Sequence, residues 1–170
     1  AALWKKNPAG GYFPNQYLLI NPAGDSLDEF NQLGWAHAVS EDGVWIGGDG
    51  DYANNYEPWL WSEATGYKPL GKIAEGAGNV TGINHDGTVV IGWFDMGMWD
   101  PAVPFIWTAN QGMMNLNTYI TDILGLSMPN SPVYVPNSIS YNGDYITGWG
   151  YDFNIGMWGD YFTFRLDRRI

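Results

Sequence analysis

The sequence predicts an all-β chain of four-stranded antiparallel units, arranged like the blades of a β-propeller. The first observation is a ten-residue pattern that starts at Val39, Ile83 and Ile139. It reads aliphatic, Ser or Asn, any residue, Asp or Asn, and Gly, with Ile or Val three residues after that Gly and a second Gly five residues after it. Asp-Gly and Asn-Gly between apolar residues are a strong hairpin signal, because a type I′ turn needs positive φ at both central positions. Each copy therefore predicts a tight β-hairpin.

The second observation is a shared pattern behind the first two hairpins. Trp61 lies thirteen residues after Gly48, and Trp107 lies fifteen residues after Gly92. Each Trp is followed by a Gly at five residues and by a Leu four residues further on. This spacing predicts two more strands joined by a short turn. Each unit then has four strands, which we name A, B, C and D in chain order.

The polar residues of the hairpin pattern have a structural interpretation. Ser and Asn side chains at its second position can bond the local backbone, and Asp or Asn before the Gly tolerates the left-handed conformation. We therefore expect a turn-forming role for these residues: Ser40, Asn84, Ser140, Asp42, Asp86 and Asn142.

The repeat divides the chain, as a single β-propeller-like domain or fragment, into units of two, four, four and three strands. Residues 1–20 form a half blade, residues 35–71 and 79–117 form full blades, and residues 136–166 form a terminal blade without its last strand. The turn glycines are 44 residues apart from Gly43 to Gly87 and 56 apart from Gly87 to Gly143. Such periods suit propeller blades. We expect the incomplete, C-terminal portion of a larger propeller; the alternative is a four-bladed ring with one strand displaced.

An insertion over residues 118–133 explains the longer second period. Ile120, Ile123, Leu124 and Met128 follow helical spacing before Pro129. The spacing predicts one short helix.

The composition indicates a packed protein and excludes some classes of partner. Aromatic residues make up 16% and hydrophobic residues 45%, which argues against low complexity despite 23 Gly and 10 Pro. The net charge is -11, so binding to nucleic acid or to an anionic membrane is not expected. There is no Cys, and no apolar run approaches the roughly 20 residues that span a bilayer.

Three stretches carry a resemblance to a known family. They are the hairpin pattern, residues 104–108 (Pro-Phe-Ile-Trp-Thr) with the following Gly-Met-Met-Asn-Leu-Asn, and the insertion leading to residues 138–143 (Ser-Ile-Ser-Tyr-Asn-Gly). Over roughly residues 35 to 166 the chain resembles the HAF repeat family of bacterial extracellular proteins. The resemblance implies a secreted or surface-exposed β-propeller-like array without a common enzymatic activity.

The long loops predict where a ligand would bind. The A–B and C–D turns lie at one end of each unit, while the long B–C loops lie at the other, and function on a rigid scaffold usually resides in such loops. These loops combine carboxylates with aromatic rings, which suit a sugar ring or, for the carboxylates alone, Ca²⁺. The alternative is a purely structural role, in which the aromatic side chains pack between units and the carboxylates cap turns. The candidate ligand-binding residues are Asp51, Tyr52, Trp93, Asp95, Trp99, Tyr151, Asp152 and Trp158.

No catalytic or metal-binding residue is predicted. His37 and His85 fall in a strand and a turn, so a shared metal site is not expected, and Asp49-Gly50-Asp51 lacks the later ligands of a Ca²⁺ loop. No cofactor is therefore expected, although Ca²⁺ stays a candidate. The expected function is a bacterial binding or assembly module, extracellular, on the cell surface or periplasmic, that presents its loops to a glycan or a protein.

Two alternatives stay open. Paired loop carboxylates would suit a glycoside-active enzyme if their separation were about 5 to 9.5 Å. The second alternative is a purely structural subunit of a larger surface complex. Its incomplete blades would then be completed by another chain through β-augmentation, or by a missing segment of a parent chain.

Overall fold

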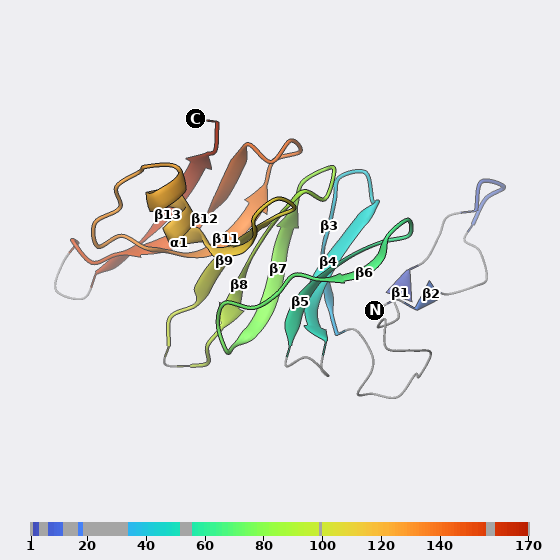
Figure 1. The fold of residues 1–170 in the computed structure, drawn as a ribbon, viewed down its shortest axis with the longest axis horizontal. Coiled ribbons are helices and arrows are strands. Elements are labelled where there is room, and N and C mark those ends of the chain that lie inside the picture. The colour runs from blue at the N-terminus through green and yellow to red at the C-terminus, as the bar shows by residue number, and fades with distance from the viewer. Residues whose placement is uncertain are drawn as a thin grey trace.

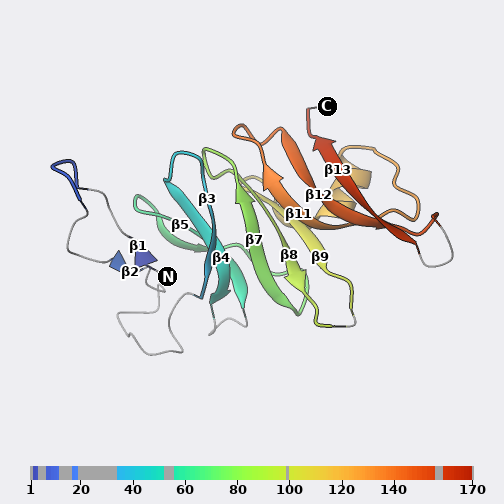
Figure 2. The ribbon, with the colours of Figure 1, turned by 180° about the vertical axis from the view of Figure 1, so that it is seen from behind.

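The computed structural model describes residues 2–3, 7–11, 17–18, 34–51, 56–98, 100–155 and 159–169. It confirms the predicted fold class, an all-β, β-propeller-like array of antiparallel sheets. Figures 1 and 2 show three larger sheets side by side, with the second between the first and the third. The first sheet contains β3 (Ala36–Val39), β4 (Trp45–Asp51), β5 (Glu57–Ser62) and β6 (Gly66–Pro69). The second contains β7 (Ala77–Ile83), β8 (Val89–Asp95), β9 (Val103–Thr108) and β10 (Gly112–Asn115).

The third sheet contains β11 (Val133–Ile139), β12 (Tyr145–Asp152) and β13 (Asp160–Asp167). A small separate sheet pairs β1 (Ala2–Leu3) with β2 (Tyr17–Leu18). Within every larger sheet, strands that follow one another in the chain are neighbours, so each sheet is an antiparallel meander. The strands A of the three larger sheets are therefore β3, β7 and β11.

The hydrophobic core lies between the sheets. Because successive side chains of a strand point to opposite faces, β8 serves both neighbours. Val90 and Phe94 pack with Leu60 of the first sheet, while Ile91 packs with Ile146 of the third. All five side chains are at most 1% exposed. The second sheet is thus buried on both faces, as expected of a blade between two others.

The insertion contains a short helix, as predicted, which begins two residues before the predicted start of the insertion. It comprises α1 (Leu116–Thr118) and the π-helical turn η2 (Tyr119–Ile123). The side chain of Asn115 caps its start by accepting a hydrogen bond from the backbone N–H of Asn117 at 2.8 Å. Gly125, with φ of 66°, follows its last turn, and a left-handed glycine at this place ends helices. Buried residues spaced by four hold the helix against the core between the second and third sheets: Leu116, Ile120 and Leu124.

The hairpin turns differ from the predicted type I′. Of the residues between strands A and B, only the glycine has positive φ, at 75° for Gly43, 68° for Gly87 and 79° for Gly143. In the first hairpin the N–H of Gly43 donates to the carbonyl of Ser40, and the N–H of Ser40 donates to the carbonyl of Trp45. The loop is therefore four residues long, with a left-handed glycine after the tight turn, and the expectation of positive φ at both central residues is wrong.

The polar residues of the pattern form the same hydrogen bonds in all three turns. The side chain at the second position accepts from the backbone N–H five residues later at 2.9 Å in each copy. The Asp or Asn before the glycine accepts from the N–H two residues later at 3.1 to 3.2 Å. This bond satisfies the turn without left-handed backbone at the Asp. The predicted turn-forming role of these residues is confirmed.

Candidate functional site

Each A–B strand pair contains a β-bulge at the same position. In the first sheet the pairing passes from Ala36 to Ala38 and skips His37. The corresponding shifts in the second and third sheets skip Thr81 and Asn137. All three residues lie six positions before the turn glycine. Bulges redirect side chains and occur often beside functional sites, so three equivalent bulges mark this part of the fold.

The bulges explain the second glycine of the repeat. A Cβ on Gly48 would lie 1.8 Å from the carbonyl oxygen of Trp35, which directly precedes strand A. On Gly92 and Gly148 it would lie 2.0 and 2.2 Å from the carbonyl oxygens of the equivalent strand A residues. The close approach of the two backbones leaves no room for a side chain.

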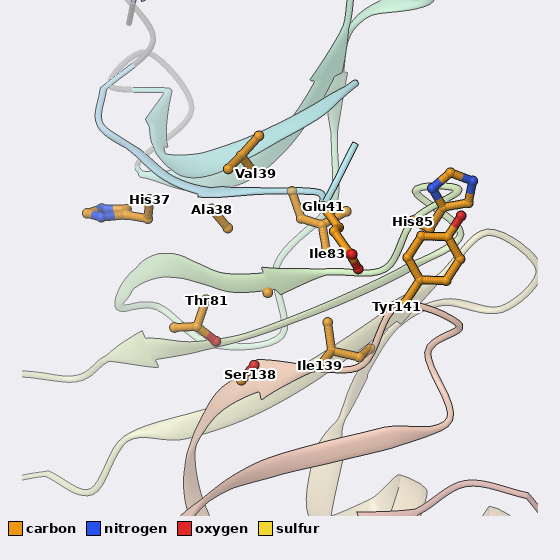
Figure 3. A pocket seen from close by; sticks show the side chains of 11 residues that line it. His37, Ala38, Val39, Glu41, Thr81, Ile83, His85, Ser138, Ile139 and Tyr141 are labelled. Carbon is orange, nitrogen blue, oxygen red and sulfur yellow. The ribbon is translucent and has the colours of Figure 1, made fainter. Parts of the chain in front are cut away.

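A pocket of about 380 Å³ lies along the strands A of all three larger sheets, and we call it the A-strand pocket. Figure 3 shows its walls, with β3 on one side and β7 and β11 on the other. Three sets of register-equivalent residues contribute to it, together with His37 and Thr81. These sets are Ala38, Gly82 and Ser138; Val39, Ile83 and Ile139; and Glu41, His85 and Tyr141.

An adjoining pocket of about 470 Å³ continues along the same strands. It is lined by all three bulged residues and also by Asn79, Val80 and Trp93. His37 and Thr81 line both pockets. The bulges themselves were not predicted, although the repeat holds a signal: each copy has a polar residue six positions before the turn glycine.

A buried carboxylate orients His37. Its Nε2 lies 3.3 Å from Oδ1 of Asp49, a residue that is 8% exposed. The same oxygen accepts a hydrogen bond from the backbone N–H of Trp35 at 3.2 Å. The carbonyl of Asp49 accepts from Nε1 of Trp59 at 2.7 Å. The carboxylate of Asp49 thus holds the imidazole of His37 in place at the wall of the pocket.

At the other end of the A-strand pocket, His85 joins the three hairpin turns. Its backbone N–H donates to the carbonyl of Tyr141 at 2.8 Å, and its ring stacks on the ring of Tyr141 with centroids 4.2 Å apart. Its Nδ1 lies 3.1 Å from Oδ2 of Asp42 in the first turn. The hydroxyl of Ser40, which donates to Asp42, is the main cause that lowers the pKa of that carboxyl, and His85 adds to it.

Four of the eight predicted ligand-binding residues have described side chains, and they lie on β8 and β12. Trp93 belongs to β8 and lines the adjoining pocket, whereas Asp95 is exposed at the end of β8 and accepts from the N–H of Gly97 at 2.9 Å. Asp51 ends β4, but its side chain is outside the described part of the structure. Three other predicted ligand-binding residues lie outside the described residues: Tyr52, Trp99 and Trp158.

Tyr151 and Asp152 lie together at the long-loop end of the third sheet. Tyr151 is the centre of a group of rings, with centroid distances of 5.0 Å to Phe153, 5.1 Å to Tyr161 and 6.4 Å to Tyr134. Trp149 lies 5.5 Å from Tyr161 in an edge-on arrangement. We call these five residues the aromatic cluster. Tyr161 is 71% exposed and Phe153 53% exposed, so the cluster presents rings to solvent.

Asp152 follows Tyr151 at the end of β12, and its carboxylate is held by Asn154. Its Oδ1 accepts hydrogen bonds from the backbone N–H of Asn154 at 2.8 Å and from the side-chain amide at 2.9 Å. The backbone hydrogen bond is the main cause that lowers the pKa of Asp152. The aromatic cluster and this carboxylate thus lie at the same end of the third sheet.

Within the described ranges, no three His, Asp or Glu side chains lie close enough together to hold a metal ion. Nor does any helix in that part of the chain have the length and apolar character needed to cross a membrane. The Ca²⁺ site therefore stays a prediction.

The fold has relatives among solved structures. TolB from Acinetobacter baumannii superposes with a TM-score of 0.50 at 13% identity, over 98% of this chain and 35% of that chain. A putative TolB from Agrobacterium tumefaciens gives a TM-score of 0.47 at 14% identity, over 78% of this chain and 50% of that chain. This chain thus spans half or less of the length of either structure. The first likeness agrees with a β-propeller-like fold. A scan against protein-family models gives no match, and a search of curated proteins gives none either.

Proposed function

We propose that this chain is part of a β-propeller-like binding or assembly module whose aromatic cluster contacts a protein partner. The observation that carries the proposal is the exposure of Tyr161 and Phe153 at the end of the third sheet where β12 ends with Asp152. Clustered aromatic residues are enriched where proteins bind each other, because large rigid rings bury much area at a low cost in conformational entropy. The cluster also lies at the long-loop end that the repeat predicts for binding.

The neighbouring strand supports the same partner class. β13 is the outer strand of the three-stranded sheet, and Tyr161 lies on it. An outer strand offers backbone N–H and C=O groups to an added strand, while side chains next to it provide specificity. A partner segment that pairs with β13 would therefore also contact the aromatic cluster.

A glycan is the second candidate partner. Sugar rings stack on aromatic faces, and carboxylates accept their hydroxyl hydrogens. Tyr151 and Asp152 supply both features within one loop end. As part of the same proposal we place the module in the bacterial envelope or at the cell surface, on the resemblance to HAF repeats.

Site-specific photo-crosslinking in cells of the source organism tests the proposal. A benzophenone side chain replaces Tyr161 in the full-length protein, and a matched probe replaces Val44, which is 50% exposed at the opposite end of the repeat. We expect one discrete protein adduct from position 161 that position 44 does not give. Binding of the purified chain to a glycan array that is lost in Tyr161→Ser would instead favour the glycan. Absence of both signals would refute the proposal.

A further inference from the structure

The A-strand pocket is rich in hydrogen-bond acceptors and carries one formal negative charge. Among the described residues that line it, Glu41 is the only one with a formal charge, and Figure 3 shows its carboxylate directed into the space between β3 and β7. The hydroxyl oxygens of Thr81 and Ser138 face the same pocket. In the part of the chain that the structure describes, no Lys or Arg lines this pocket or the adjoining one. A positively charged donor would find acceptors on each side of the pocket.

The wall of the A-strand pocket near the hairpin turns also favours a positively charged ligand. Tyr141, which is 53% exposed, presents aromatic surface there, and the faces of Tyr rings attract cations. Asp42 lies 3.1 Å from His85 and brings a second carboxylate near this wall. The chain as a whole has a net charge of -11, which draws cations from solution.

The polarity of the pocket is not needed for the turns. The backbone of each hairpin is satisfied by Ser40, Asn84 or Ser140 and by the Asp or Asn two residues later. No hydrogen bond described for the turns uses Glu41. The bulged residue of each strand A lies at the adjoining pocket. Thr81 donates its hydroxyl hydrogen to the carbonyl of Pro136 and keeps its oxygen as an acceptor.

We propose that the A-strand pocket binds an organic cation, and preferably a guanidinium group, with Glu41 as its anionic partner. A guanidinium is planar and donates two parallel hydrogen bonds to a carboxylate, whereas an ammonium acts as a point charge. Its remaining N–H groups would reach the hydroxyl acceptors of Thr81 and Ser138. This site is separate from the aromatic cluster and does not depend on the function proposed for that cluster.

Calorimetric titration of the folded chain with arginine amide and with its neutral isostere citrulline amide tests the charge requirement. We expect saturable binding of arginine amide and at least about tenfold weaker binding of citrulline amide, as for loss of a charge-assisted hydrogen bond. Glu41→Gln should weaken arginine amide binding by a similar factor. The matched control is Asp122→Asn, which removes one exposed negative charge on η2 and should leave binding unchanged.

A third arm separates a free cation from a side chain of a peptide. If the peptide Gly-Gly-Arg-Gly-Gly binds more tightly than arginine amide, the cation belongs to a chain segment; if arginine amide binds at least as well, it is a small molecule. Circular dichroism melting of each variant confirms that it folds. Equal binding of the charged and neutral amides, or unchanged binding in a folded Glu41→Gln variant, would overturn the proposal.

Discussion

The imidazole ring of His85 lies against the phenol ring of Tyr141, with centroids 4.2 Å apart and planes at 17°. The two residues occupy the same position of the repeat in neighbouring sheets, so the contact joins two hairpin turns. Stacked rings contribute about 0.5–1.5 kcal/mol beyond the area that they bury. A double-mutant cycle with His85→Ala and Tyr141→Ala should give a coupling free energy in that range in urea unfolding. Additive effects of the two substitutions would show that the ring contact does not couple the turns, which the backbone hydrogen bond from His85 to Tyr141 still joins.

The second glycine of the repeat should be required for stability. In Gly48→Ala the new Cβ would lie 1.8 Å from a backbone carbonyl oxygen, which only a backbone shift can relieve. We expect a loss of about 1–3 kcal/mol or more in the free energy of unfolding. In Gly47→Ala the nearest atoms are side-chain methyls of Val80 and Ile83 at 2.9 and 3.0 Å, which can shift more easily than a backbone carbonyl, so the loss should be smaller. Equal losses in denaturant unfolding would contradict the bulge geometry.

Asn84 should contribute more to stability than its counterpart in the third hairpin. It is 3% exposed, accepts from the buried N–H of Val89 and donates to Asp86. Asn84→Ala leaves a buried donor unsatisfied and should cost about 1–3 kcal/mol. Ser140→Ala removes the corresponding bond to Tyr145 at a more exposed position and should cost less. Thermal unfolding of the two variants gives the comparison, and a larger effect at Ser140 would argue against it.

Much of the repeat could be predicted because its signals are local. The glycine positions and apolar alternation indicated the hairpins, and spaced apolar residues indicated the helix. The turn type was predicted wrongly, because the hydrogen bond from the N–H of Val44 to the Asp42 side chain makes a longer loop favourable. The bulge at His37 and its place beside Thr81 could not be predicted. A polar residue recurs six positions before each turn glycine, but the bulge and its neighbours depend on strand register and on how separate sheets lie against each other.

Stability should fall at acidic pH through the turn carboxylates. The pKa of Asp86 is lowered from 3.8, first by the hydroxyl of Thr88, and the pKa of Asp42 is lowered first by Ser40. A carboxyl with a lowered folded-state pKa contributes stability that is present above about 3.8 and is lost as the pH falls through the folded value. The double variant Asp42→Asn with Asp86→Asn keeps the acceptor oxygen, as Asn142 does in the third turn. Its unfolding midpoint should therefore change less than that of the wild type between about pH 5 and pH 2. Parallel pH profiles would contradict this assignment.

The arrangement of the three strands A around common pockets is the central structural claim, and the absence of native Cys permits a direct test. Cys is introduced in pairs, His37→Cys with Thr81→Cys and Thr81→Cys with Asn137→Cys, and each pair is treated with a short bis-maleimide. Thr81→Cys with Glu63→Cys is the control, because Glu63 belongs to the C–D turn of the first sheet and lines neither pocket. The account predicts efficient intramolecular crosslinking of both strand A pairs and little of the control. Thiols that react singly with maleimide but do not crosslink in either strand A pair would contradict it.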